Sequence, residues 1–451
     1  MLVYFVNHST APINLGGAER SMMALVEDWY ASDPEFEAVF ITKAPRGKFV
    51  DALEERGWAY RSFRYRGWTI PNDTPPQSEI TFFANDDYRS TLEIIEMMEQ
   101  RRPDLVVTNT LVAPWAAFAA AVVGVPHAWF IREFGDLDHG LAFQIGRENT
   151  FQDIALMSQA VFTNSIALRD HIGAYIDVSD VQVVYPRIDA AAQKVRATEP
   201  PAIRPFGDGI DLAVTVVGRL ADSKGQWRVI EALGILRERG LRVGLCLVGG
   251  QERPDYDVSL TRRAARLGVG DQVVITGEQA NPFPFIAAAD VCVTPSGIEA
   301  FGRTTLEYML AGKAVVASEL GGSAELVSDG TTGFLFHPDD TTALADALER
   351  YARDPELRTA YATAAESRAR ELIDHEFSNA NAIERLKRTA SAEPYRLPNI
   401  ARYWFSLPGH YFATAGRGPR ITLSFIRTRL RGRLGAVVKR PLAALRRRIA
   451  R

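Results

Sequence analysis

Residues 291–318 read VCVTPSGIEAFGRTTLEYMLAGKAVVAS. The run opens with a short β-rich stretch, Val291–Thr294, and closes with a second one, Ala314–Ser318. Between them, Thr304–Ala311 has the residue pattern of a helix. In a strand–helix–strand unit the two strands run parallel in one sheet. The stretch therefore predicts a parallel sheet that helices cover on both faces.

The same alternation of strands and helices extends in both directions from this stretch. We predict further strands at Leu2–Asn7, Ala38–Thr42, Asp104–Asn109, Pro126–Ile131, Ala160–Asn164, Gln182–Tyr185, Leu212–Val217, Arg242–Val248, Gln272–Thr276 and Phe334–Phe336. We predict further helices at Ala18–Tyr30, Thr91–Arg102, Ile166–Tyr175, Gln226–Arg239, Val258–Leu267, Pro284–Ala288, Thr341–Arg353 and Pro355–Leu372. A hairpin is expected around Gly330 and Gly333. This order of elements indicates an α/β chain with two doubly wound sheets in succession.

The Pro-rich segment Thr198–Pro205 lies between the two halves and is typical of a linker. We therefore predict two Rossmann-like domains, residues 1–195 and 205–380, that face each other across a cleft, followed by a tail at residues 394–451. In open sheets of this kind, ligands bind at the carboxyl ends of the strands. Functional side chains are therefore expected in the loops that follow the strands.

The tail, residues 394–451, differs in charge from the rest of the chain. It holds fourteen of the 52 Lys and Arg residues and none of the 55 Asp and Glu residues, so the first 393 residues carry a formal balance of −17. From about residue 417 onward, apolar residues mix with the arginines, as in amphipathic helices. We expect peripheral contact with an anionic membrane. A docking arm for a partner protein and plain disorder stay open as alternatives, and nucleic acid is not expected as a partner.

The remaining composition is typical of a globular protein from a reducing compartment. Cys246 and Cys292 lie in apolar, strand-like runs and form neither a disulfide framework nor a metal-binding spacing. Pro114 and Pro126 divide the longest apolar stretch, Val112–Ile131, so we predict a core helix and a core strand there instead of a membrane span. We expect no secretory signal and a cytoplasmic location, with the tail as the contact to the inner face of the membrane.

Two glycines, Gly16 and Gly17, follow the first predicted strand and precede a predicted helix. Glycine lets backbone amides approach a ligand closely, and the start of a helix favours an anion. A simple turn before the helix is the alternative interpretation. The motif is not Gly-x-Gly-x-x-Gly and no Walker lysine follows it, which argues against a dinucleotide dehydrogenase and a P-loop enzyme.

Two cations, Arg219 and Lys224, lie five residues apart after the predicted strand Leu212–Val217. This spacing places a guanidinium and an ammonium group at the carboxyl edge of the second sheet. A departing diphosphate carries several negative charges and needs such a pair. Because surface cations are common in loops of this kind, a solvated role is the alternative for each residue taken alone.

Two glutamates, Glu299 and Glu307, frame the strongest motif of the chain, EAFGRTTLE. Glu299 lies in the loop after a predicted strand, and Glu307 lies about one turn into the next helix. The turn at Phe301 and Gly302 directs free backbone amides toward a ligand at the start of that helix. The two carboxylates can then bind two separate hydroxyl groups. Two exposed carboxylates around a helix cap are the alternative.

Together these motifs resemble those of the retaining GT-B glycosyltransferases of family 4. The resemblance spans about residues 1–380, is strongest from 212 to 336, and does not include the tail. The matching elements are, in order, Gly16-Gly17, Arg219, Lys224-Gly225, Glu299, Phe301-Gly302, Glu307, Met309 to Val316, Gly321-Gly322, Glu325-Leu-Val and Gly330–Gly333.

For the diphosphate and the reaction, the resemblance implies these roles. Arg219 and Lys224 would neutralise the diphosphate, and Gly16 and Gly17 would close on it from the other domain. Arg219, Lys224 and Glu299 would form the catalytic set.

For the rest of the donor, the resemblance implies contacts on both sides of the diphosphate. Glu307 would hydrogen-bond the ribose hydroxyl groups. Glu299 would contact the transferred sugar, assisted by the backbone amides of Phe301 and Gly302. The nucleobase would lie against the loop after Gly277.

The chain departs from the family pattern where the acceptor is expected. Many relatives have a histidine near the cleft after the strand that corresponds to Pro126–Ile131, whereas this chain reads Arg132-Glu133 there. The usual role of that histidine therefore stays open. We take His8, Arg132 and Glu133 as candidates for the acceptor side of the site.

The resemblance implies a retaining hexosyltransferase. Such an enzyme moves a sugar from a nucleoside diphosphate to a glycan or lipid-linked acceptor, here expected in cell-envelope polysaccharide synthesis, with no metal and no further cofactor. A nucleotide-sugar epimerase and a non-catalytic nucleotide-sugar-binding protein are alternatives. A metal-dependent transferase would need an Asp-x-Asp motif. Residues 136–138 and 255–257 fit this short pattern, but neither follows a well-defined strand beside a nucleotide loop.

Overall fold

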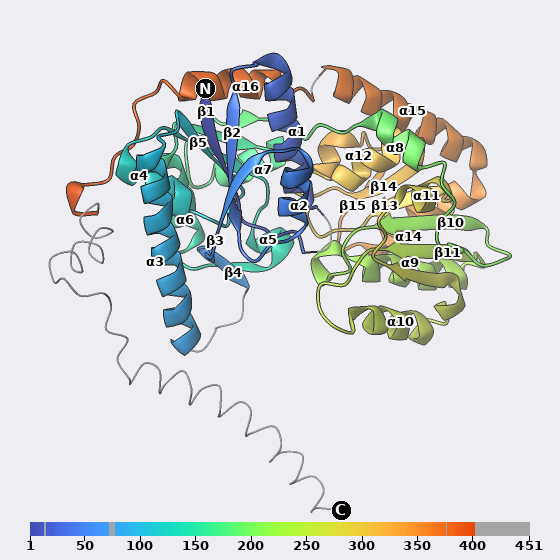
Figure 1. The fold of residues 1–451 in the computed structure, drawn as a ribbon. Helices are drawn as coiled ribbons and strands as arrows, with labels where there is room; N and C mark the ends of the chain where they lie inside the picture. Colours follow the sequence, from blue (N-terminus) through green and yellow to red (C-terminus); the bar gives the residue numbers. More distant parts are fainter. Residues whose placement is uncertain (13–14, 72–76, 376, 402–451) are drawn as a thin grey trace, which may run out of the picture. The chain divides into compact units, whose positions relative to one another are not determined.

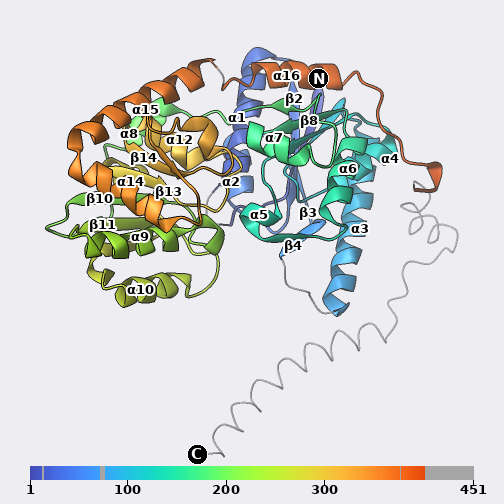
Figure 2. The ribbon, with the colours of Figure 1, turned by 180° about the vertical axis from the view of Figure 1, so that it is seen from behind.

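The structure is a computed structural model and describes residues 1–12, 15–71, 77–375 and 377–401. Residues Met1–Leu397 form one compact unit, shown from two sides in Figures 1 and 2. The predicted amphipathic part of the tail lies outside the described residues, so its interpretation stays a prediction.

The first lobe is built on a seven-stranded parallel sheet. Its strands are β1 (Leu2–Asn7), β2 (Glu37–Lys43), β3 (Ala59–Phe63), β5 (Leu105–Asn109), β6 (His127–Ile131), β8 (Ala160–Thr163) and β9 (Gln182–Val183). They are ordered β3-β2-β1-β5-β6-β8-β9, and every neighbouring pair is parallel. A separate antiparallel pair consists of β4 (Thr69–Pro71) and β7 (Leu141–Phe143). The central strands β5 and β6 are buried along their whole length, as expected for a parallel sheet covered on both faces.

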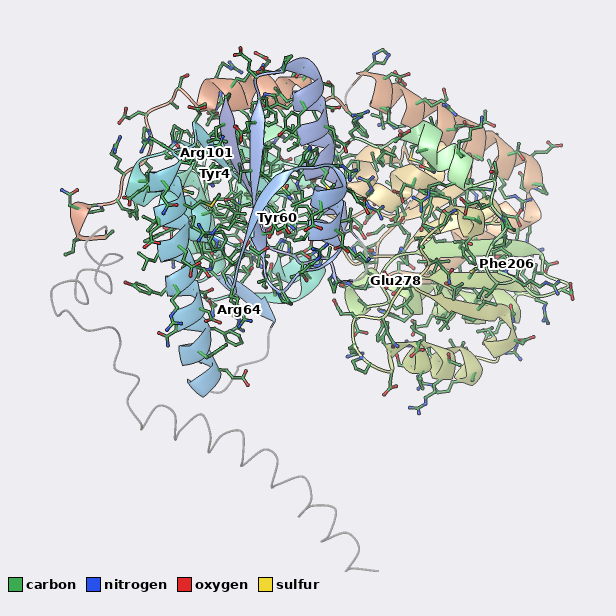
Figure 3. The ribbon with its side chains drawn as sticks, in the orientation of Figure 1. Tyr4, Tyr60, Arg64, Arg101, Phe206 and Glu278 are labelled. Carbon is green, nitrogen blue, oxygen red and sulfur yellow. The ribbon has the colours of Figure 1, made fainter. Side chains whose placement is uncertain are left out.

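Helices cover this sheet and join its strands. They are α1 (Gly17–Ser32), α2 (Lys48–Glu55), α3 (Gln77–Gln100), α4 (Trp115–Val123), α5 (Asp136–His139), α6 (Arg147–Met157) and α7 (Ile166–Ile172). Figures 1 and 2 both show α3 beside α4. At the amino edge of the sheet, the Tyr4 hydroxyl donates to the Arg101 carbonyl at 2.7 Å (Figure 3). Polar groups at this edge are thus bound within the protein, and ligands are expected at the opposite, carboxyl edge of the sheet.

The second lobe is a six-stranded parallel sheet of the same kind. Its strands are β10 (Leu212–Val217), β11 (Val243–Val248), β12 (Val273–Gly277), β13 (Val291–Thr294), β14 (Ala314–Ser318) and β15 (Phe334–Phe336), ordered β12-β11-β10-β13-β14-β15. Its helices are η1 (Asp222–Lys224), α9 (Gln226–Glu238), α10 (Tyr256–Arg266), η2 (Gly270–Gln272), α11 (Phe283–Ala287), α12 (Arg303–Leu310), α13 (Ser323–Leu326), α14 (Thr341–Arg353) and α15 (Pro355–His375). The predicted fold class, two doubly wound parallel sheets, is confirmed.

The chain crosses between the two lobes twice. The first crossing leads into α8 (Ala190–Arg196), which packs with the core of the second lobe through Ala190 and Ala197. The second crossing leads from α15 to α16 (Ala380–Thr389), which contributes Ile383 and Leu386 to the core of the first lobe. The predicted domain limits at 195 and 380 stay predictions, because residues 1–397 form a single unit.

Two expectations from the sequence were wrong in detail. The hairpin expected around Gly330 and Gly333 is a tight turn, closed by a 2.9 Å bond from the Gly330 amide to the Gly333 carbonyl, and β15 pairs in parallel with β14. The helix predicted at Thr91–Arg102 begins far earlier, at Gln77. In addition, β3 was missed. Most of its residues are exposed or half-buried, so this edge strand lacks the apolar run that marks a buried one.

The apolar stretch Val112–Ile131 contains helix α4 and strand β6, as predicted. Within the described ranges, no helix has both the length and the apolar character needed to cross a bilayer. Cys246 and Cys292 are buried and unbridged in β11 and β13, which confirms their interpretation as small core residues.

Candidate active site

The strand order of the second lobe reverses between β10 and β13. Each of these neighbouring strands is followed by a loop with charged residues, Arg219 and Lys224 after β10 and Glu299 after β13. In doubly wound sheets the ligand crevice lies at such a reversal, outside the carboxyl ends of the strands. The topology therefore places these three predicted side chains at the expected position of a ligand.

Lys224 and Glu299 form an ion pair at this edge. The Lys224 Nζ lies 2.7 Å from Glu299 Oε1, and both side chains are mostly buried, with 20% and 15% of their surface exposed. The Ser296 hydroxyl donates to the same carboxylate oxygen at 2.5 Å. Burial by itself would raise the pKa of the Glu299 carboxyl, but the charge and hydrogen bonds of Lys224 and Ser296 lower it below its ordinary value. Glu299 is therefore an anion held in a fixed position.

Gly225 explains why the Lys224 loop comes so close to the loop after β13. Gly225 has a φ of 68°, and a Cβ atom built on it would lie 2.0 Å from the Pro295 carbonyl oxygen. Only glycine fits this left-handed conformation and this close approach. The residue after Lys224 thus fixes the distance between the two loops that carry the ion pair.

Arg219 lies at the same edge and is more exposed. Its guanidinium lies 3.2 Å from Glu252 Oε1 and 3.1 Å from Nδ1 of His139 on α5. Because a guanidinium only donates, Nδ1 of His139 must accept, which leaves the proton on Nε2, 3.7 Å from Asp138. Burial, together with Lys224 and Arg219, lowers the pKa of His139, so the imidazole is neutral.

The start of α12 provides backbone donors beside Glu299. Gly302 caps the helix with a φ of 88°, and a Cβ atom on it would lie 2.4 Å from the Ser323 hydroxyl oxygen. In the part of the chain that the structure describes, the amides of Phe301 and Gly302 have no acceptor. The Phe301 ring is buried against Tyr185 and Phe377, so it anchors the turn, and only its backbone faces a ligand.

Glu307 lies one turn further along α12 and is 6% exposed. Its carboxylate accepts from Arg303 Nε at 3.2 Å. The Nη1 atom of Arg303 is buried and has no partner among the described residues, which marks it as a donor available to a ligand. The sequence interpretation missed Arg303, although its position between Gly302 and Glu307 could have indicated it.

Gly16 and Gly17 form the start of α1, and Gly16 has extended backbone angles. A Cβ atom on Gly17 would lie 3.8 Å from Arg303 Cδ, and one on Gly16 would lie 2.6 Å from Glu19 Oε2. The two glycines therefore adjoin the α12 side of the site and leave no side chain of their own in it.

The loop after Gly277, where the nucleobase is expected, follows β12. It begins with Glu278, which Figure 3 labels. The Gln279 amide donates to the Thr276 carbonyl, and the Asn281 amide donates to the Arg196 carbonyl. These two side chains therefore shape the loop itself.

The acceptor-side candidate His8 follows β1 and is half-buried. Its Nδ1 lies 2.9 Å from the Thr110 hydroxyl oxygen. Burial, with smaller contributions from Lys43 and His139, lowers the pKa of His8 to about 3, so the ring is neutral at physiological pH. A neutral imidazole can form one hydrogen bond, as donor or as acceptor, to a hydroxyl group of the acceptor substrate.

The other two acceptor-side candidates, Arg132 and Glu133, are buried and bind the protein itself. The Arg132 Nε donates to Asn109 Oδ1 at 2.5 Å, and the guanidinium lies 4.9 Å from the centre of the Phe130 ring. Glu133 Oε1 accepts from the Leu111 amide at 2.7 Å, and burial raises the pKa of its carboxyl to about 8. Both side chains therefore shape the loops at the edge of the first sheet.

The Asp-x-Asp residues 136–138 have structural partners. Asp138 accepts from the amides of Phe134 and Gly135 at 3.1 and 2.8 Å, and Asp136 pairs with Arg147. This cap at the start of α5 is what places His139 against Arg219. Within residues 1–401, apart from the undescribed positions, no three His, Cys, Asp or Glu side chains are grouped as metal ligands.

Comparisons with known proteins show which proteins this chain is similar to. The family model described as "Glycosyl transferases group 1" matches residues 208–368, which include every predicted site residue of the second lobe. The α-D-kanosaminyltransferase of Streptomyces kanamyceticus is 38% identical over 148 residues, 32% of this chain and 37% of that protein. The chain spans less than two thirds of the length of the first curated relatives that it matches.

A longer match is found with the α-maltose-1-phosphate synthase of Mycolicibacterium smegmatis. It is 30% identical over 290 residues, which cover 59% of this chain and 73% of that protein. Among solved structures, Anabaena HepE in complex with UDP has a TM-score of 0.65 and 22% identity, and covers 87% of this chain and all of that chain. The likeness to HepE shows that this chain has the same two-lobed fold as that structure.

Proposed function

This chain belongs to the family of glycosyl transferases group 1, and on that basis we propose that it is a retaining GT-B hexosyltransferase of family 4. It transfers a sugar from a nucleoside diphosphate to an acceptor hydroxyl group. One observation carries the proposal: the Lys224–Glu299 ion pair lies beside unpaired amides at the start of α12, with Glu307 one turn away. The Lys224 ammonium group suits a diphosphate, Glu299 and the free amides suit the transferred sugar, and Glu307 suits the ribose hydroxyl groups.

In the proposed reaction the bond between the anomeric carbon and the diphosphate oxygen breaks first. The acceptor hydroxyl then attacks the oxocarbenium-like carbon from the same face and gives its proton to an oxygen of the leaving phosphate. Arg219 and Lys224 stabilise the charge that develops on the diphosphate. Glu299 orients the sugar ring, and Glu307 binds the ribose hydroxyl groups.

No metal ion is needed in this proposal, because two cationic side chains and the helix start supply the positive potential. The acceptor is a glycan or a lipid-linked sugar used in cell-envelope polysaccharide synthesis. The enzyme would work in the cytoplasm, with residues 394–451 contacting the inner face of the membrane. UDP-sugars are the first donors to test, since Anabaena HepE binds UDP.

The proposal is tested by thermal-shift screening of the full chain with UDP-, GDP-, ADP- and dTDP-sugars, followed by an assay of donor turnover with and without a chelator. We expect one donor class to raise Tm and turnover to be unchanged by the chelator. Arg219→Ala and Lys224→Ala should each lower kcat by about 10²–10³-fold, the usual effect of removing a donor that stabilises developing charge.

Arg262→Ala is the matched control, because Arg262 is exposed on α10. It should keep the activity of the parent. Unchanged turnover in both Arg219→Ala and Lys224→Ala would contradict the assignment of the diphosphate site. Release of an altered nucleotide sugar without transfer would instead indicate an epimerase.

A further inference from the structure

The first sheet has its own reversal of strand order, between β1 and β5. His8 follows β1 and Thr110 follows β5, and their side chains are 2.9 Å apart. By the same rule that places the donor in the second lobe, a second ligand belongs at this edge. The carboxyl edge of the first sheet is therefore the second place in this fold where a ligand is expected.

The backbone of Thr110 supports a functional role for this edge. Its φ is 140°, a conformation that a β-branched residue rarely adopts. Strained residues of this kind are concentrated at ligand sites, where the surrounding structure holds them in place. Here the Trp129 indole donates to the Thr110 carbonyl at 2.7 Å and holds the strained turn.

Cations dominate the part of this edge formed by β2 and β3. Lys43 is the last residue of β2, and Arg66 lies three residues beyond the end of β3. Both side chains are half-buried, and the Arg66 guanidinium lies 4.3 Å from the centre of the Phe83 ring. Among the described residues, no carboxylate lies within 4 Å of either cationic group, although most exposed cations of this lobe have such a partner.

One carboxyl group, Asp87, acts on these cations, but it does not neutralise them. Its Oδ1 accepts from the backbone amide of Arg66 at 2.5 Å, so its nearest partner is the main chain. Burial raises the pKa of Asp87 to about 6, and burial lowers the pKa of Lys43. Among the described residues, Asp87 is thus the carboxyl group whose charge acts on both cations. In such a partly desolvated place an incoming anion is bound more strongly than at the open surface.

We propose that Lys43 and Arg66 bind a phosphate group of the acceptor, with His8 and Thr110 contacting its hydroxyl groups. The proposal rests on the proposed function, since the proposed reaction needs an acceptor and this edge of the first sheet is where we expect it. Arg offers a planar fork and Lys a compact charge, and both are common phosphate ligands. The phosphate can belong to a soluble sugar phosphate or to a phospholipid-linked sugar, and the experiment separates these two sources.

The experiment uses the full chain saturated with UDP, so that the diphosphate site is occupied. Calorimetric titration with glucose 6-phosphate and with glucose tests the soluble source. Calorimetric titration with water-soluble dihexanoyl phosphatidic acid, and with dihexanoyl phosphatidylcholine as control, tests the lipid source without a vesicle surface for residues 394–451 to bind. The variants are Lys43→Met and Arg66→Met, with Arg61→Met as control, because Arg61 lies on β3 and also covers a ring, that of Phe63 at 5.1 Å.

We expect a phosphate-containing probe to bind the parent chain and the Arg61→Met control. Lys43→Met and Arg66→Met should weaken this binding by about ten- to a hundredfold, the scale of a hydrogen bond to a charged group. Loss of glucose 6-phosphate binding identifies the soluble source, and loss of dihexanoyl phosphatidic acid binding alone identifies the lipid source. Phosphate binding that both variants retain, or equal binding of glucose, would overturn the proposal.

The affinity for UDP separates this proposal from the proposed function. Lys43→Met and Arg66→Met should bind UDP as the parent does, which also shows that they fold. If the parent binds no nucleotide, the donor assignment fails. If it binds UDP but no phosphate probe, only the acceptor proposal fails.

Discussion

Lys224 and Glu299 stabilise each other while no donor is bound. Their charged atoms are 2.7 Å apart, and most of the surface of both side chains is covered. A half-buried charge without a partner costs several kcal/mol, so the pair keeps both charges in place at the edge of the sheet. In the proposed reaction, the diphosphate would meet an ammonium group that is already positioned, and little reorganisation would be needed.

At the residue scale, Glu133 gives a pH-dependent prediction. Its carboxyl has a pKa of about 8 in the folded chain, against about 4.3 when unfolded, so the folded chain holds this proton more tightly. The free energy of unfolding should therefore fall as the pH rises between these two values, and this contribution should be lost in full above pH 8. In Glu133→Gln the fall should be smaller by about 1.4 kcal/mol for each pH unit in this interval.

Urea unfolding of the parent and of Glu133→Gln at pH 5.5 and pH 7.5 measures this difference. The amide oxygen of the variant can still accept from the Leu111 amide, so the loop keeps its hydrogen bond. Equal losses of stability in both proteins between the two pH values would show that Glu133 is already ionised when folded.

At the element scale, α12 combines a tight turn with an open start. The turn needs Gly302, because its backbone is left-handed and Ser323 occupies the space beside it. Thr305 inside the helix joins Thr294 of β13 and Ser323 of α13 by hydrogen bonds of 2.8 and 3.0 Å. These bonds fix the helix relative to the strands, and they leave its first amides to a ligand.

Gly302→Ala is therefore expected to destabilise the protein. The left-handed backbone alone costs about 1–2 kcal/mol for a residue with a Cβ atom, and the contact with Ser323 adds to this. Thermal unfolding measures the loss. In the double variant Gly302→Ala/Ser323→Ala, part of the lost stability should return, because the contact with the Ser323 hydroxyl is removed. The cost of the left-handed backbone at residue 302 should remain. A Tm equal to that of the parent would mean that the turn has no fixed conformation.

At the scale of the whole molecule, both crossings between the lobes meet one residue of α1. Asp28 pairs with Arg187 of the first crossing, and its Oδ2 accepts from Asn379 of the second at 2.7 Å. These residues line a cavity of about 480 Å³ together with Phe377 and Lys387. The two lobes therefore share their connecting segments, and helix α16 completes the core of the first lobe.

This sharing predicts that a change in α16 destabilises the first lobe. Leu386 is fully buried in that core, and Leu386→Ala should cost about 2–5 kcal/mol, the usual range for truncating a buried leucine. Denaturant unfolding, followed by tryptophan fluorescence, is the measurement, because five of the seven tryptophans lie in the first lobe. Glu384→Ala on the exposed side of the same helix should stay within about 0.5 kcal/mol. Equal stability of both variants would contradict the role of α16.

The sequence by itself determined the layered fold and the loops that carry the candidate donor site. β10, β13 and β14 match their predicted limits, because buried β-branched runs bounded by loop residues are a local signal. The rule for the carboxyl ends of strands then located the charged loops. The edge strand β3 carried no such signal, because most of its side chains face solvent.

Only the tertiary structure decided which charges meet. Lys224 and Glu299 are 75 residues apart, and His139 and Arg219 are 80 apart, so their pairing depends on how distant loops are brought together. Burial, which moves the pKa of Glu133 and His8, is likewise set by the packed neighbours. Residue types and periodicity are local properties of the chain, whereas ion pairing and desolvation arise from contacts that exist only in the folded molecule.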